Sequence, residues 1–492
     1  MSEATSRALM PRLLRAEWTK FRSVPGWVAG SAVAALLIVL FPLTGLGGGA
    51  PERARPIPIG PDGAPVSTAF YFVHRPLSGD GHITVAVTSL TSLSARDGGA
   101  TAAWAKAGLI ITAGSAPGAR YAAVMVTGAH GVRMQHDYIH DKAGPPGEAM
   151  RWLRLTRSGD TVTGEASPDG TRWSRVGTVR LPGLANTVHA GLFVACPQDV
   201  RGVGTASDVA TAEFGEPRVS GAWPAGGWSG DQMGADTATF AGYPPGSSGG
   251  FTQSGGGFTV TGAGDLAPAA RVDVVPAAAV NDLLFGTFPA LVVIVVVATL
   301  TITTEYRYGL IHSTLSAGNR RGRVLLAKAV VLGGVTFTTS LVTTVLAVRL
   351  WSWLVRGLGV YLFPATSGAL LRAEVGTAAL LALAAVFALG VGTILRRSAP
   401  AVTIVIVAVV VPYLLALVPF LPPPMAQWLT RVTPAAALAV QQTLVRHPQV
   451  DSVYTPAYGY YPLPPWAGMA VLCGYALVAL AVAAAVLHRR DA

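Results

Sequence analysis

The chain has 492 residues, of which 51% are apolar and only 12% are charged, and its net charge is +11. An ordinary soluble protein has about a quarter of charged residues, so this composition excludes that class and favours a membrane protein. On a soluble protein the basic surplus would favour nucleic-acid binding. Here it follows the membrane topology, and no nucleic-acid partner is expected.

The first predicted element is an amphipathic helix that precedes an apolar run. Apolar residues recur at three- and four-residue spacing from Leu9 to Phe21, with basic residues between them. Such a helix beside a span is expected to lie in the membrane interface, and a cytosolic helix packed on a partner is the alternative. Its candidate contact residues are Leu14, Glu17, Trp18, Lys20 and Phe21.

Six apolar runs are each long enough to cross a bilayer, because about 20 helical residues span a hydrocarbon core of about 30 Å. They are Trp27–Leu46, Leu283–Thr303, Val324–Val348, Val375–Leu395, Ala401–Phe420 and Trp466–Leu487. None has an ionisable residue in its middle, which disfavours a proton relay or a voltage sensor. The first run is too long for a cleavable signal peptide and is predicted to remain as a span.

Basic residues gather in alternate connections between these runs. They precede the first run, follow the last, and lie between the second and third and between the fourth and fifth. The positive-inside rule places these parts in the cytoplasm. A multi-pass plasma-membrane protein with both termini cytoplasmic is predicted, although Arg349, Arg356 and Arg372 fall on the outer side.

A stretch of different character, residues 47–280, separates the first two runs. It is rich in Gly, Thr, Ser, Val and Pro and lacks helical periodicity. It is too long for a loop, and short alternating strands between turn residues predict an extracellular all-β sandwich with its core at about 68–214. Residues 215–275 predict either a flexible stalk or closing strands, and the pattern around Phe251 and Phe258 favours strands.

The predicted protein is therefore a multi-domain membrane protein. Residues 1–46 supply the interfacial helix and the first span, the sandwich is an insertion, and residues 281–492 supply the other five helices of a six-helix transmembrane domain. Residues 417–445, after the fifth run, contain prolines and a further amphipathic stretch. They are either a re-entrant segment or a helix that lies on the outer membrane surface.

Two polar sets in the outer stretch were natural candidates for chemistry. The sequence QHDYIHD places His136 and His140 near carboxylates, but it equally suits a polar surface strand and loop, and no metal site is predicted. Glycoside hydrolysis needs a pair of carboxylates, which one strand can carry as Glu-x-Asp-x-x-Glu. That spacing is absent, since Glu165 and Asp169 flank a turn, and hydrolase activity is not expected.

The connection between the second and third runs is unusually charged. The sequence TTEYRYGLIHSTLSAGNRRGRVLLAKA, residues 303–329, holds one glutamate and six basic residues. Positive-inside anchoring explains the later basic residues but not Glu305 and Gly309. The other interpretation is a water-facing lever on which a second subunit pushes. Glu305 would then either cap a following helix or pair with a neighbouring arginine.

The membrane half resembles the permease subunits of type-2 ABC exporters of the actinobacterial kind, found in high-GC Gram-positive bacteria. The resemblance rests on LLRAEWTKFRSVPGW, residues 13–27, and on the charged segment. In that family the first is an interfacial elbow helix, and the second is a coupling helix that sits in a groove of a separate ATPase. Within 304–328 it implies coupling through Glu305, Arg307, Gly309, Thr314, Arg320, Arg321, Arg323 and Lys328.

The outer stretch resembles the concanavalin-A-like jelly-roll family of sugar-binding and glucanase domains. The hairpin of Ser167, Asp169, Gly170 and Trp173 carries the likeness as a structural turn, with Trp173 expected in the core. Such a fold does not specify chemistry. The resemblance implies one of two roles for this domain: it binds a glycan or glycolipid, or it serves as a scaffold on which a partner docks.

The motor must be another polypeptide, because a Walker A loop needs Gly-Lys followed by Ser or Thr, and no lysine here follows a glycine. The expected function is the non-enzymatic permease subunit of an ATP-driven exporter for an amphipathic, lipid or drug-like substrate. Its partners would be an ATPase that binds ATP and Mg²⁺, a second permease chain and the lipid bilayer. The alternative is a membrane-anchored glycan-binding protein without transport activity.

Overall fold

The structure is a computed structural model that describes residues 3–45, 55–93, 100–145, 151–201, 204–244, 246–274, 277–310, 321–417 and 421–489. It divides into two compact units. The helical unit comprises Met1–Ala50, Ala277–Val445 and Tyr454–Ala492, and the β unit comprises Pro51–Pro276 and Arg446–Val453.

The helical unit contains most of its residues in long apolar helices. The α-helices are α1 (Glu3–Ser23), α2 (Pro25–Leu40), α4 (Val280–Leu283), α5 (Thr287–Arg307), α7 (Arg321–Gly357), α8 (Ser367–Leu395), α9 (Ser398–Leu417), α10 (Pro423–Val432) and α11 (Pro465–Arg489). Shorter elements are the 3₁₀ helices η1 (Phe41–Gly45), η4 (Pro434–Gln441) and η5 (Pro456–Tyr458) and the parallel pair β19 (Ala277–Ala278) and β20 (Tyr361–Leu362). Within the described residues, six helices are long and apolar enough to cross a membrane, and they match the six predicted runs.

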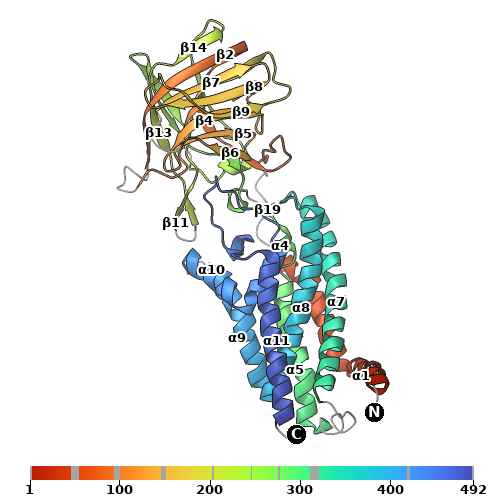
Figure 1. The fold of residues 1–492 in the computed structure, drawn as a ribbon. Helices are drawn as coiled ribbons and strands as arrows, with labels where there is room; N and C mark the ends of the chain where they lie inside the picture. Colours follow the sequence, from red (N-terminus) through yellow and green to blue (C-terminus); the bar gives the residue numbers. More distant parts are fainter. Residues whose placement is uncertain are drawn as a thin grey trace. The chain divides into compact units, whose positions relative to one another are not determined.

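Helices α5 and α8 form the centre of the helical unit. In the most apolar 18-residue stretch of each helix, 61% of the residues of α5 and 67% of those of α8 are buried. In the first candidate span, Pro25–Leu43, which contains α2, the corresponding fraction is 11%. Helix α8 packs on α5, α7, α9 and α11, which run side by side in Figure 1. Helix α1 and the last turn of α11 lie at the same end of the bundle, where α5 ends and α7 begins (Figure 1). Six successive spans would place the two ends of the chain on the same side of a membrane.

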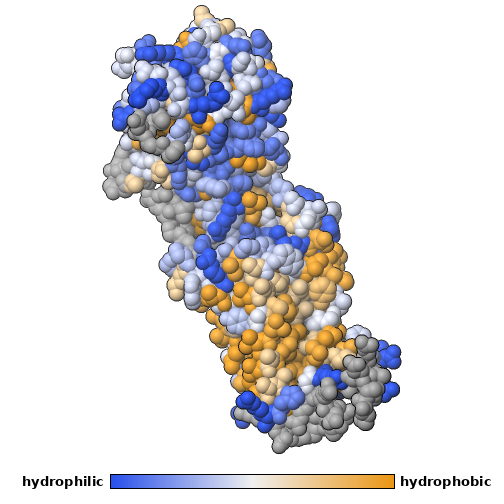
Figure 2. Space-filling view, in the orientation of Figure 1, coloured by the Kyte–Doolittle hydropathy of each residue, from blue (hydrophilic) through white to orange (hydrophobic). Residues whose placement is uncertain are grey.

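The outside of the helical unit is broadly hydrophobic, as the face in Figure 2 shows along the middle of the bundle. Large apolar side chains such as Leu36, Val342 and Leu477 are more than half exposed. A soluble protein rarely exposes a continuous apolar surface of this kind, so the surface is suited to lipid.

The connection between α9 and α11 folds back into the bundle. Helix α10 exposes Trp428, whereas every residue of η4 is buried, against α8, α9, α10 and α11. Two glycines allow this close approach: a Cβ atom at Gly376 of α8 would clash with Val440, and one at Gly468 of α11 would clash with the Ala436 carbonyl oxygen. The burial of η4 favours the re-entrant alternative for this segment.

The β unit is built from antiparallel strands. They are β1 (Val66–Thr68), β2 (Phe70–Ser92), β3 (Lys106–Thr112), β4 (Tyr121–Thr127), β5 (Val132–His136), β6 (His140–Ala143), β7 (Trp152–Ser158), β8 (Thr161–Ser167), β9 (Ser174–Arg180), β10 (Thr187–Ala195), β11 (Asp199–Arg201), β12 (Gly204–Ala206), β13 (Ala210–Phe214), β14 (Arg218–Ala222), β15 (Ser229–Met233), β16 (Gly250–Ser254), β17 (Gly257–Gly262) and β18 (Leu266–Pro268). The 3₁₀ helices η2 (Ala238–Phe240) and η3 (Arg271–Asp273) lie between them.

The long strand β2 belongs to both layers of the β unit. Its first part pairs with β10, which leads to β3, β4, β5 and β6, and its middle pairs with β7, which leads to β8 and β9. Alternate residues from the two layers, among them Leu109, Val124, Leu153 and Val162, meet in one buried core. Strands β16 and β17 form a hairpin that extends the sheet through β13, so the strand interpretation of this region is confirmed.

Residues Arg446–Val453, which the sequence analysis placed with the helices, pack on the β unit instead. The Gln449 side-chain amide donates to the Ile139 carbonyl oxygen at 2.8 Å, and Val450 packs with Ala267 and Ala270. The β unit is thus made from two separate parts of the chain, Pro51–Pro276 and this late segment.

A buried lysine fixes the strand pair β1–β18 to the outer face of the β3 layer. Lys106 is fully buried, and its Nζ donates to the Asp265 carboxylate and, at 2.9 Å, to the Leu266 carbonyl oxygen. Leu266 in turn packs with Phe72 and Ile110, whose side chains would otherwise lie open on this face. The ion pair therefore holds the cover of the sheet in place.

We expect Lys106→Met to lower the free energy of unfolding of the β unit by about 3–5 kcal/mol, because it leaves the Asp265 carboxylate buried without its partner. Lys142→Met, at an exposed lysine of β6, is the matched control and should change it by less than about 0.5 kcal/mol. Thermal unfolding of the full chain in detergent measures both. Equal midpoints for the two variants would contradict the role given to Lys106.

Candidate functional site

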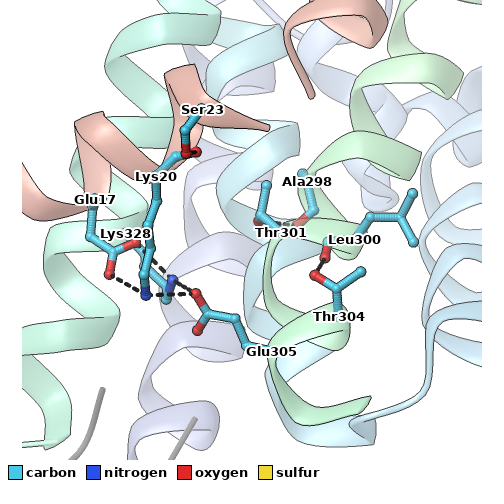
Figure 3. Close-up of polar contacts among 9 residues, drawn as sticks. All are labelled: Glu17, Lys20, Ser23, Ala298, Leu300, Thr301, Thr304, Glu305 and Lys328. Atoms are coloured by element: carbon cyan, nitrogen blue, oxygen red, sulfur yellow. Dashed lines mark hydrogen bonds and ion pairs between the residues drawn. The ribbon is translucent and has the colours of Figure 1, made fainter. Parts of the chain in front are cut away.

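Four charged side chains from three helices meet where α5 ends (Figure 3). Glu17 and Lys20 come from α1, Glu305 from the last turn of α5, and Lys328 from α7. The Lys328 Nζ lies 2.7 Å from Oε2 of Glu17 and 2.6 Å from Oε1 of Glu305. The Lys20 Nζ lies 2.9 Å from the same Glu305 oxygen and 3.5 Å from Oε1 of Glu17. We call these four residues the ion cluster.

The periodicity of α1 explains how it supplies two members of the ion cluster. Glu17 and Lys20 are three residues apart and therefore share a helix face. Phe21 is buried in the core of the helical unit and contacts Trp27, with ring centroids 6.2 Å apart. Trp18, in contrast, is 49% exposed. Glu17, Lys20 and Phe21 of α1 thus face the bundle, whereas the exposed Trp18 side chain is free to contact lipid.

Three of the four residues of the ion cluster are buried, Lys20 is partly exposed, and the charges balance. Glu17, Glu305 and Lys328 are 7%, 3% and 6% exposed. Burying an ion costs several kcal/mol unless partners compensate, and two carboxylates here face two ammonium groups. Burial acts to lower the pKa of Lys20, but hydrogen bonding and the charge of Glu305 outweigh it, and the pKa is raised.

One oxygen of the cluster is left over. Oε2 of Glu305 is buried and has no hydrogen-bond partner among the described residues. An ionised carboxylate is an acceptor at both oxygens, so the cluster retains capacity for one more donor.

The end of α8 is joined to the same region. Arg396 ends α8 in the left-handed conformation, with φ of 57°, and its guanidinium lies 5.1 Å from the ring centre of Tyr306. Tyr306 follows Glu305 directly, so this cation–π contact links α8 to the last turn of α5. Four helix ends, those of α1, α5, α7 and α8, are therefore tied together by charged side chains.

The structure brings together only some of the residues that the sequence proposed for coupling. Glu305 and Lys328 lie in the ion cluster. Arg307 stacks on Tyr308 with 5.8 Å from its guanidinium carbon to the ring centre, and Gly309 ends α5 with φ of 68°. Arg323 lies near the start of α7. Helix α7 begins at Arg321, and Thr314 and Arg320 fall outside the described residues.

Sequence reasoning missed that the two predicted segments share one site. It treated Glu17 and Lys20 as part of an interfacial helix and offered Glu305 a cap or an arginine as partner. The partners in the structure are Lys20 and Lys328. A signal for this site was present in the sequence. Glu17 and Lys20 lie on the predicted interfacial helix, and a glutamate and a lysine lie at the ends of two apolar runs, where a charge needs a partner.

The proposed hairpin of the β unit is a tight hydrogen-bonded turn. Ser167 Oγ accepts from the Gly170 amide at 2.9 Å, and Asp169 Oδ1 accepts from the Thr171 and Arg172 amides at 2.8 and 2.9 Å. These backbone donors hold the pKa of Asp169 well below its usual range.

The expectation that Trp173 fills the core is wrong. Leu153 and Leu155 of β7 point into the core, so the residue between them, Arg154, points outward. Trp173 is half-buried, and its ring lies 3.8 Å from the Arg154 guanidinium carbon. It packs on the outer face of the layer, where Trp152 covers Gly170.

The histidines of the QHDYIHD sequence stack on each other with ring centroids 4.4 Å apart. Burial, followed by the charge of His140, lowers the pKa of His136 to about 4. Over the described residues, no group of three His, Cys, Asp or Glu side chains lies close enough to hold a metal ion.

Comparisons with known proteins identify no family. No family model and no curated protein matches the chain. Among solved structures, a functionally unknown protein from Saccharomyces cerevisiae is 17% identical, covering 32% of this chain and 76% of its own, with a TM-score of 0.20. SCP-B, an eqolisin-family peptidase in complex with a tripeptide, is 9% identical, covering 40% of this chain and 98% of its own, with a TM-score of 0.25. Likenesses this weak carry no argument about function.

The charge balance of the ion cluster is open to a double-mutant test. Lys328→Met should lower the free energy of unfolding by about 3–5 kcal/mol, because two buried carboxylates then share only Lys20. Adding Glu305→Gln leaves the neutral pair of Glu17 and Lys20 and should recover about 1–3 kcal/mol of that loss. Thermal unfolding in detergent measures these changes.

Arg12→Met, at an exposed arginine of α1, is the control and should have little effect. If the losses from Lys328→Met and Glu305→Gln simply added, the four residues would not act as one balanced cluster.

Proposed function

We propose that the chain is the transmembrane permease subunit of an ATP-driven ABC exporter, which works with a separate ATPase to move an amphipathic, lipid or drug-like molecule outward. The ion cluster is the observation that carries this proposal. It joins an amphipathic N-terminal helix to both helices that flank the charged connection of residues 308–320. A contact for an external motor requires such a rigid base.

The physical argument concerns how force reaches helices that lie in lipid. A motor that pushes on a flexible loop would only bend the loop. In this chain the connection leaves α5 after Arg307 and enters α7 at Arg321, and ion pairs tie Glu305 and Lys328 to α1. A push on the connection therefore displaces α1, α5 and α7 together. The contact of Arg396 with Tyr306 extends the displacement to α8.

In this proposal the end of the bundle with the ion cluster faces the cytoplasm, and the β unit lies outside the plasma membrane. The basic residues that flank the cluster agree with that orientation. ATP and Mg²⁺ belong to the partner ATPase, and a second permease chain, identical or related, completes the path.

The alternative, a membrane-anchored glycan-binding protein with a concanavalin-A-like domain, is less well supported. One span suffices for an anchor, and the described residues contain six candidate spans. On one outer face of the β unit, that of Phe72, Phe193 and Ile110, the side chains are buried with the strand pair β1–β18 and are not accessible to a glycan.

The test is purification of the tagged chain from its native host in mild detergent, followed by identification of co-purifying proteins and an ATPase assay. A stoichiometric nucleotide-binding subunit is expected. Glu305→Gln with Lys328→Met, which keeps the cluster neutral, should lower permease-dependent ATPase activity by about tenfold, within the usual range of coupling between sites.

Arg356→Gln, at the opposite end of α7, should leave that activity unchanged. Recovery of the chain without any ATPase would overturn the exporter proposal, and glycan binding by the purified full chain would then become the leading hypothesis.

A further inference from the structure

A groove lined by hydroxyl groups lies between α2, α5 and α7. Its lining includes Ser31 of α2, Ile294 of α5 and Thr336, Thr339, Ser340 and Thr343 of α7. The groove is open at Thr339, which is exposed. None of its lining residues is ionisable.

The position of the groove along α7 corresponds to the middle of a bilayer. At about 1.5 Å per residue, Thr336 lies about 12 Å and Thr343 about 22 Å along the helix from Lys328. A hydrocarbon core is about 30 Å thick, so if the ion cluster marks one surface, the groove lies near the midplane.

Most hydroxyls around the groove are used within their own helices. Ser31 donates to the Trp27 carbonyl oxygen at 2.9 Å, Thr339 to that of Val335 at 2.8 Å, and Thr343 to that of Thr339 at 2.9 Å. Their O–H donors are therefore occupied, and only lone pairs remain.

Thr336 and Ser340 differ from the others. They are 8% and 3% exposed, and within the described chain neither hydroxyl makes a hydrogen bond. A hydroxyl without a partner is unfavourable at this depth, because hydrocarbon offers no water to replace the missing bond. The groove thus presents two free donors, one turn of helix apart, to whatever enters it.

We propose that this groove binds the polar group of a neutral amphipathic molecule that enters from the membrane. An ester carbonyl or hydroxyl oxygen of the molecule accepts from Thr336 and Ser340, while its hydrocarbon part lies along α2 and α7. The absence of ionisable groups from the lining disfavours a charged head group. The inference rests on the proposed exporter function, for which it names the class of substrate and its site.

The test uses two photoactivatable probes in nanodiscs that hold the purified full chain. One probe is a diacylglycerol with a diazirine in an acyl chain, and the other is a hydrocarbon with the same diazirine chain and no polar group. After illumination, mass spectrometry locates the labels. Diacylglycerol should label the groove segments of α2 and α7 about fivefold more than the hydrocarbon does, as expected for about one hydrogen bond.

The combined substitution Thr336→Val and Ser340→Ala removes both free donors and should abolish that preference. Thr338→Val is the matched control, because Thr338 is exposed on the same helix outside the groove lining and donates to Gly334. It should leave labelling unchanged, and elution as a single species confirms that each variant is folded.

Equal labelling by the two probes, or labelling that survives the double substitution, would overturn the proposal. So would cross-linking of a Thr339→Cys variant to a second copy of the chain in the membrane, because the groove would then be a subunit contact. The experiment uses no ATPase. A negative labelling result therefore does not affect the exporter proposal. Equally, if no ATPase co-purifies with the chain, the labelling result remains valid.

Discussion

Two glutamates and one lysine, buried beside a partly exposed second lysine, must balance in charge, because each ion removed from water costs several kcal/mol unless a partner compensates. In this chain the balance can be met only if α1, α5 and α7 converge, since Glu17, Glu305 and Lys328 come one from each helix. The apolar parts of α5 and α7 are suited to many arrangements in lipid, where hydrophobic burial does not favour one helix pairing over another. The ion cluster selects one of them and fixes an otherwise peripheral helix, α1, to the bundle.

Elsewhere in the helical unit, charged side chains and hydroxyl groups occupy different positions along the helices. Charges lie near helix ends, where the long side chains of Lys and Arg can reach water. Hydroxyls lie in the middle, and most return their hydrogen bond to the helix that carries them, as Thr339 and Thr343 do. Some polar groups have no partner in the described chain: Oε2 of Glu305 is buried without a hydrogen bond, and the hydroxyls of Thr336 and Ser340, which face the groove, make none. In the proposed groove, the hydroxyls of Thr336 and Ser340 are the donors for the substrate.

The sequence predicted the six apolar helices and the β-rich insertion because hydropathy and residue periodicity are local properties. Helix ends were less predictable. Helix α7 continues to Gly357 and α8 begins at Ser367, since Arg349, Arg356 and Arg372 interrupt the apolar pattern without breaking the helix. The ion cluster escaped prediction for another reason. Glu17 and Lys328 are 311 residues apart, and only tertiary packing brings them within bonding distance. The same holds for Trp173, whose side of the sheet depends on strand register, and for Arg446–Val453, which joins the β unit through Gln449 and Val450.

The central claim is that α1 and the adjoining ends of α5 and α7 move as one block when the motor acts. Distances between spin labels in the complex of the chain with its ATPase test this directly, with one pair at Arg12 of α1 and Leu326 of α7, and a second pair at Arg12 and Ile404 of α9; all three positions are exposed. Between the nucleotide-free and ATP-bound states the first distance should stay constant while the second changes. A change in the first distance as large as that in the second would contradict the account.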